Sequence, residues 1–123
     1  YPNRNTINTM AFVLDQSDTY KCKVEIEVPV GKKTETQDFY AEFKNISQSR
    51  LQEMMQQVAN QEMLDVDVAK EILIGWEGME MSDGSEVPFN KSNRDKLLDV
   101  RGVATAISYA FVESCKNKNI KNL

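Results

Sequence analysis

The most constraining feature of this chain is a change in hydrophobic period just before Ser47. Ahead of it, apolar side chains alternate with polar ones over residues 22–30 and again over residues 38–44. This alternation is typical of strands that bury one face, and the Gly31-Lys32-Lys33 segment between them is typical of a turn. The sequence therefore predicts an N-terminal β-hairpin, with Pro29 near the end of an edge strand.

Beyond the change, apolar residues recur every three or four positions. Between residues 51 and 58 this spacing predicts an amphipathic helix of about three turns, with a polar face rich in glutamine. Its cap is either Ser47 or Ser49, and Gln52 stands where a capping box with Ser49 would need it. The chain thus passes from strand to helix patterning.

A second helix and a second hairpin are expected next. The short helix starts at Asp65 or Asp67 and ends at Gly75. Residues 76–81 and 86–89 flank a Ser-Asp-Gly-Ser turn, and Asp-Gly between such runs is a strong signal for a hairpin. The sequence therefore predicts a second, short hairpin that contains the only tryptophan.

Two more helices complete the expected fold. Asn90 or Ser92 caps the first of them, and Gly102 separates it from a last helix whose small and apolar residues allow close helix packing. We therefore expect one α+β domain over residues 10–115, with an N-terminal β-hairpin, a short second hairpin and about four helices. Residues 1–9 are expected to be a flexible extension, with Met10 as the natural start, and residues 116–123 a flexible basic tail.

The residue types argue against an enzyme. The chain contains no histidine, which removes the commonest general base and the commonest zinc ligand. The Gly75-Trp76-Glu77-Gly78 segment lacks the Lys-Ser/Thr of a phosphate-binding loop. Asp65 and Asp67 are interpreted as helix-start residues, not as metal ligands. We therefore expect no catalytic residue, no metal site and no cofactor.

Charge and hydropathy restrict the partners. The net charge is −4, which argues against nucleic acid because phosphate binding needs concentrated Lys and Arg. No stretch approaches the ~18 apolar residues of a membrane span. The two cysteines, Cys22 and Cys115, are interpreted as reduced thiols of a cytosolic protein. The sequence therefore predicts a protein that binds other proteins, and neither nucleic acid nor a membrane.

Methionine and aromatic residues are the candidate contacts. Methionine fills irregular gaps in cores, and it also forms adaptable binding surfaces; tryptophan is enriched at interfaces, but it can equally anchor a hairpin. For Met54 or Met55 a core position is the alternative, and for Trp76 a core or hairpin anchor. The candidate contacts with a partner or a second copy are Met54, Met55, Trp76, Met79, Met81 and Phe111.

The order of several short segments resembles that of one family. They are Met10–Asp15, the Val-Glu-Ile-Glu-Val-Pro-Val strand, Phe43 with the serine-rich helix start, Ile-Gly-Trp-Glu-Gly, the Asp-Gly turn before Val-Pro-Phe, Leu-Leu-Asp at residues 97–99, and Val-Ala-Thr-Ala-Ile from residue 103. Each segment alone is a weak signal. Together, over residues 10 to about 115, they are similar to the tail assembly chaperones of long-tailed bacteriophages.

The resemblance implies a non-enzymatic phage or prophage protein made in two forms, the longer by a programmed ribosomal frameshift. The shared part would self-associate as a homo-oligomer, such as an open spiral. It would hold the tape measure protein soluble while tail tube subunits polymerise around it, and the longer form would contact the tail tube protein. The resemblance places this work in the host bacterial cytoplasm and implies that the chaperone is absent from the mature virion.

The C-terminal residues fit the short form. The Lys116-Asn117-Lys118-Asn119 run requires adenine-rich codons, on which a ribosome can slip. This chain is therefore interpreted as the short, unshifted form, with a merely basic surface tail as the alternative. Two other functions stay open: a structural virion component, such as a head–tail connector or a tail subunit, and a small acidic adaptor domain.

Overall fold

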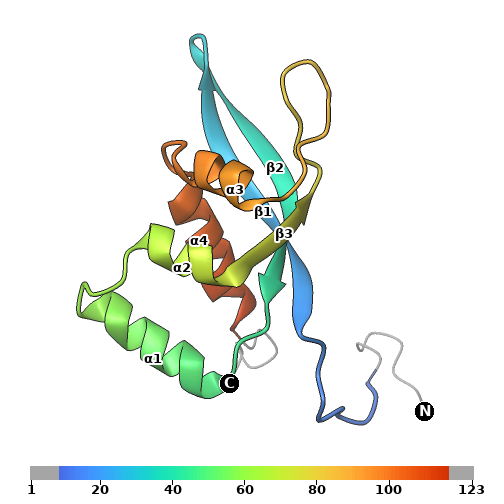
Figure 1. Cartoon of the computed structure of the whole chain (residues 1–123), viewed down its shortest axis with the longest axis vertical. Coiled ribbons are helices and arrows are strands. Elements are labelled where there is room, and N and C mark those ends of the chain that lie inside the picture. The colour runs from blue at the N-terminus through green and yellow to red at the C-terminus, as the bar shows by residue number, and fades with distance from the viewer. Residues whose placement is uncertain (1–8, 117–123) are drawn as a thin grey trace.

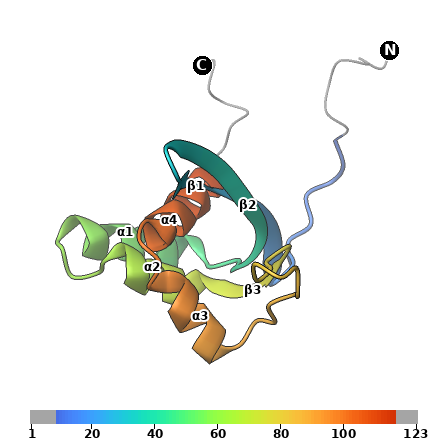
Figure 2. The same ribbon diagram turned by 90° about the horizontal axis from the view of Figure 1, so that it is seen from above.

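A computed structural model describes residues 9–116 and has the expected α+β architecture. In chain order the elements are β1 (Thr19–Val30), β2 (Lys33–Lys44), α1 (Gln48–Ala59), α2 (Asp65–Ile72), β3 (Leu73–Glu77), α3 (Lys91–Leu98) and α4 (Val103–Ser114) (Figure 1). The strands form an antiparallel sheet in the order β1-β2-β3. The curved hairpin of β1 and β2 wraps around α4 (Figure 2). The expectations for residues 1–8 and 117–123 lie outside the described residues.

The predicted N-terminal hairpin is confirmed. β1 pairs with β2 from Thr19 opposite Lys44 to Val30 opposite Lys33, and Gly31 takes a positive φ of 60° in the turn. The base of the hairpin is buried, with Phe43 fully covered. Near the turn, residues 33–38 of β2 are all exposed. The hairpin therefore extends beyond the core, further than the apolar alternation alone predicts.

Helix α1 begins where one of the two expected caps places it. The Ser47 hydroxyl accepts a hydrogen bond from the Arg50 amide at 3.1 Å, so Ser47 is the cap and the alternative capping box at Ser49 is not used. The Arg50 guanidinium donates to both carboxylate oxygens of Glu71 on α2, at 2.7 and 2.6 Å. Met54 points into the core with no exposed surface. Cap, ion pair and buried methionine together position α1.

The expected end of the second helix is wrong. Helix α2 begins at Asp65 but ends at Ile72, and the next five residues form β3 along β2, with Trp76 opposite Ala41. Gly75 lies inside this strand and does not end a helix. A Cβ atom there would stand 2.8 Å from Oε1 at the end of the flexible Glu42 side chain, so a larger residue would have to displace that carboxylate. Strand pairing, a non-local interaction, overrides the helical pattern.

The predicted second hairpin is present only in reduced form, because Trp76 belongs to the main sheet. Glu80 and Glu86 form an isolated bridge. The Met81 amide donates to the Ser85 carbonyl at 2.8 Å, and the Val87 amide to the Met79 carbonyl at 2.9 Å. The Asp-Gly turn itself is confirmed at the tip. This segment is therefore a loop held by few hydrogen bonds.

The last two helices match the sequence. The Asn90 side chain caps α3 by accepting from the Asn93 amide at 2.8 Å. Gly102, with φ of 87°, makes the turn into α4. On α4, Phe111 is buried and meets Phe43 of β2 edge to face, with ring centroids 5.5 Å apart. This contact joins the hairpin to α4 at the centre of the core.

Candidate protein-docking groove

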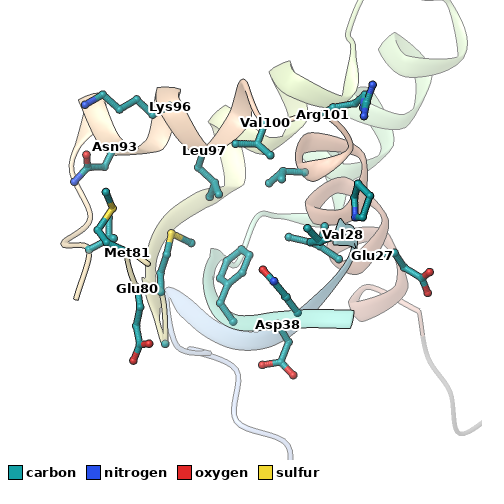
Figure 3. Close-up of a pocket in the computed structure, with 18 residues that line it drawn as sticks. Glu27, Val28, Asp38, Glu80, Met81, Asn93, Lys96, Leu97, Val100 and Arg101 are labelled. Atoms are coloured by element: carbon teal, nitrogen blue, oxygen red, sulfur yellow. The ribbon is translucent and has the colours of Figure 1, made fainter. Parts of the chain in front are cut away.

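An apolar groove of about 660 Å³ opens between the sheet and the α3–α4 region. One wall is the turn-proximal half of the hairpin, with residues 26–29 of β1 and residues 37–39 of β2 (Figure 3). The loop residues 78–81 and Val87 close one end. The opposite wall comes from α3 and the turn to α4. The hairpin, the loop and the α3–α4 region, which lie far apart in sequence, thus form one concave surface.

Apolar side chains point into this groove. Leu97 projects from α3 towards the sheet, and Val28 of β1 and Met81 of the loop flank the same space (Figure 3). Met81 and Val100 remain 61% and 55% exposed. Large apolar groups that water reaches on a concave surface are typical of sites that bind another chain.

The charges at the rim are separated by sign. Lys96 and Arg101 lie on the helical side, whereas Glu27, Asp38 and Glu80 lie on the side of the sheet (Figure 3). Asp38 already has Lys23 at 3.5 Å. In the part of the chain that the structure describes, Lys96 and Arg101 form no ion pair. The groove therefore offers a charged ligand one preferred orientation.

Trp76 holds the loop that closes the groove. Its indole Nε1 donates to the Val87 carbonyl at 2.8 Å. Its ring meets Phe89 nearly edge to face, with centroids 4.7 Å apart. Burying an aromatic body while the polar tip keeps a hydrogen bond is the usual structural use of tryptophan. Trp76 therefore fits the interpretation as an anchor, and its effect on the groove is indirect.

The structure separates the six predicted contact residues. Met79 and Met81 line the groove, and Met55 is half-buried on α1, away from it. Met54 and Phe111 are corrections: both are buried in the core, at 0% and 1% exposure, so neither side chain has surface to offer a partner. Core packing explains both, because each lies on the inward stripe of its helix.

Sequence reasoning missed the helical wall of the groove. Leu97 and Val100 lie there, while Leu98, the neighbour of Leu97, enters the core. Leu97 lies in the last turn of α3 and Val100 in the turn after it, so no periodic spacing in the sequence marks the two as one surface. Their proximity to Met79 and Met81 depends on the path of β3, which the sequence pattern did not predict.

A second apolar feature lies at the other end of β1. Residues Met10–Leu14, called the arm below, have no secondary structure. Met10, Phe12 and Leu14 are 90%, 81% and 90% exposed. The arm leaves the fold where the Asn45 amide groups donate to the carbonyls of Ser17, at 3.0 Å, and Asp18, at 2.8 Å. Exposed apolar side chains that follow one another along a segment make the arm a candidate contact with another chain.

Within residues 9–116 no group of three or more Cys, Asp or Glu residues could hold a metal ion. None of the helices in that range is both long and apolar enough to cross a membrane.

The Asp83 carboxylate accepts hydrogen bonds from the Ser85 hydroxyl and amide, at 2.6 and 2.9 Å, which lower the pKa of Asp83. These bonds stabilise the turn at the loop tip.

A family model described as phage tail assembly chaperone matches residues 9–122. No curated protein and no solved structure matches the chain significantly. The matched range contains the arm, the whole sheet, the four helices described above and every residue of the groove.

Proposed function

Because the chain belongs to the phage tail assembly chaperone family, we propose that it self-associates and holds the tape measure protein soluble while tail tube subunits polymerise around it. The tape measure protein is a long client, so one small subunit covers only a short part of it. Several subunits must therefore act together. Binding that is weak for one subunit becomes firm when linked subunits engage the same client.

The observation that carries this proposal is the pair of apolar surfaces on one subunit. The groove holds Met81 and Val100 exposed, and the arm holds Phe12 and Leu14 exposed. A protein that works alone in water rarely leaves two such surfaces uncovered. Methionine, with its flexible thioether side chain, also suits contacts with surfaces of varied shape. Both features favour a protein whose work is to bind other chains.

We also propose that this chain is the short, unshifted form. The longer form would add the segment that contacts the tail tube protein. Support comes from the Lys-Asn run at residues 116–119, although residues 117–123 lie outside the described range. Sequencing the DNA from the codon of Cys115 onward tests this. We expect an adenine-rich slip site and an overlapping open frame; an in-frame stop with no overlapping frame would contradict it.

The client proposal is tested by co-expression. The tape measure protein of the same phage is produced with and without this chain, and its soluble fraction is measured after centrifugation. We expect it in the pellet when expressed alone and in the supernatant, bound to the chaperone, when co-expressed. The matched variants are Met81→Asp in the groove and Leu64→Asp, which changes an exposed leucine away from it. Only the groove variant should lower the soluble fraction.

The proposed place of action is the host cytoplasm, with the chaperone released before the particle is complete. Quantitative mass spectrometry of purified phage particles tests this part. We expect the tail tube and tape measure proteins in fixed ratio and this chain below one copy per particle. A fixed number of copies in every particle would instead favour a structural virion component, such as a head–tail connector.

A further inference from the structure

We infer that the arm of one copy, Met10–Leu14, docks in the groove of a second copy, so that subunits join head to tail. This inference rests on the self-association proposed above and names the contact that would produce it. It pairs the two apolar surfaces of the subunit with each other, so Met81→Asp would lower the soluble fraction of the client by weakening the assembly that holds it. Both surfaces lie within the described residues.

The arm and the groove match in polarity and size. In an extended segment Met10, Phe12 and Leu14 share one face, because side chains alternate along a strand. These three are the most exposed large apolar side chains of the arm. They would span about 14 Å along the groove. A cleft of about 660 Å³ lies within the range that encloses small ligands, so it can take the ends of a few side chains.

Charge gives the arm a direction in the groove. Asp15 follows the arm directly, and Asp18 lies three residues further on. The cations Lys96 and Arg101 line the helical side of the groove and form no ion pair within residues 9–116. Placing Asp15 towards these cations would orient the arm, since rim charges mainly set orientation and association rate.

The geometry favours a second copy over the subunit's own groove. The chain is tied to Asn45 at Ser17 and Asp18, so Leu14 can move only about 11 Å from Ser17. The groove wall on β1 begins at Ile26, about 23 Å along the strand from Thr19. The last apolar residue of the arm therefore falls short of its own groove.

Head-to-tail contact also explains how an assembly could grow. The arm precedes Thr19, at one end of β1, and the groove is lined by residues 26–29, at the other end. Each subunit would then use two different surfaces, one for each neighbour. Such heterologous contacts build rings or open filaments, depending on whether the rotation closes. An open filament could lengthen along a long client.

Sedimentation velocity of the purified chain alone tests the contact without any client. We expect wild type to grow in size with concentration. Leu14→Asp in the arm and Val100→Asp in the groove should each leave monomers, whereas the matched Leu64→Asp should assemble like wild type. All three residues are largely exposed, so the variants should melt at the wild-type temperature, which circular dichroism checks.

Mixing the two defective variants is the sharper test. The Leu14→Asp copy keeps an intact groove, and the Val100→Asp copy keeps an intact arm. One functional contact remains between them, so the mixture should form dimers and nothing larger. A synthetic peptide of residues 9–18 should bind Leu14→Asp, and changing both Phe12 and Leu14 of the peptide to Asp should weaken binding by roughly 30-fold or more.

The outcomes separate the two proposals. A wild type that stays monomeric at every concentration overturns the arm contact together with the proposed self-association. Assembly of Leu14→Asp to wild-type size overturns the arm contact alone, and so does a mixture of the two variants that stays monomeric. Dimers in the mixture, with no assembly of either variant by itself, are the result that the inference requires.

Discussion

Replacing Trp76 by Phe should loosen the groove loop without unfolding the protein. The substitution removes the indole N–H that donates to the Val87 carbonyl at 2.8 Å and keeps an aromatic ring near Phe89. The loop carries only one isolated bridge, between Glu80 and Glu86. Segments held by few interactions open locally, at a lower free energy than the global transition. The loss of stability in Trp76→Phe should therefore appear first as local opening of this loop.

The magnitude follows from the lost contact. Leaving a partly buried carbonyl without its hydrogen bond costs about 1–2 kcal/mol, and the smaller ring buries less apolar surface, which adds about 1 kcal/mol. The loop should therefore open more readily by roughly 2–3 kcal/mol, which raises the opening constant by roughly 30-fold to 150-fold.

Amide hydrogen exchange followed by NMR measures this opening residue by residue. We expect faster exchange at Met81 and Val87, whose amides donate to Ser85 and Met79 across the loop. Ile107, buried on α4, should change little. The matched control is Tyr40→Phe, which removes a hydroxyl from a half-exposed side chain on β2. If amide exchange at Ile107 rose as much as in the loop, or if exchange at Val87 did not change, Trp76 would not be the anchor of this loop.

Three further predictions concern stability. Ser47→Ala should lower the free energy of unfolding by about 1 kcal/mol, measured by urea denaturation, because the Arg50 amide loses its acceptor; an unchanged urea midpoint would contradict this. Gly102→Ala should cost about 1–2 kcal/mol in the same assay, because φ at Gly102 is 87°, and a variant as stable as wild type would show that this backbone relaxes. The Arg50 guanidinium lowers the pKa of Glu71 below the usual 4.5, so the stability from this pair is fully present above pH 4.5 and is lost as pH falls through the lower folded pKa. The urea midpoint of Glu71→Gln should therefore differ from that of wild type near neutral pH and converge with it in acid. A difference in midpoint that does not depend on pH would contradict a stabilising ion pair between Arg50 and Glu71.

The local parts of the fold could be predicted from the sequence. Alternating residues gave the first hairpin, and Ser47, Asn90 and Gly102 mark helix starts that the structure confirms. Each of these signals acts over a few neighbouring residues, through side-chain alternation, a capping hydrogen bond or a positive φ. Local physics of this kind is visible without knowledge of the tertiary structure.

Strand β3 could not be predicted in the same way. Ile72, Leu73 and Ile74 fit the end of a helix as well as a strand, and only pairing with β2 decides between them. The pattern predicts Gly75 as a helix end, whereas in the structure it lies inside β3, opposite Glu42 of β2. The groove depends on this strand, because β3 leads into the loop with Met79 and Met81. Its two methionines were predicted, but its helical wall was not.

For the arm, the sequence does not reveal whether its apolar side chains are buried or exposed. The sequence places its apolar residues in the expected domain of residues 10–115, whereas in the structure they are exposed to water rather than packed in a core. Hydrophobic residues in a sequence are usually assigned to the interior, and exposure is not visible in a residue pattern. The exposure of its side chains, and not their sequence pattern, makes the arm a candidate contact.

The central claim is that many copies of this chain cover one tape measure protein. The most direct test is native mass spectrometry of complexes with the full-length tape measure protein and with a version cut to half its length. If subunits line the client, the number of bound copies should fall by roughly half with the shorter client. The same number of copies on both clients would contradict the account and would favour binding at one defined site.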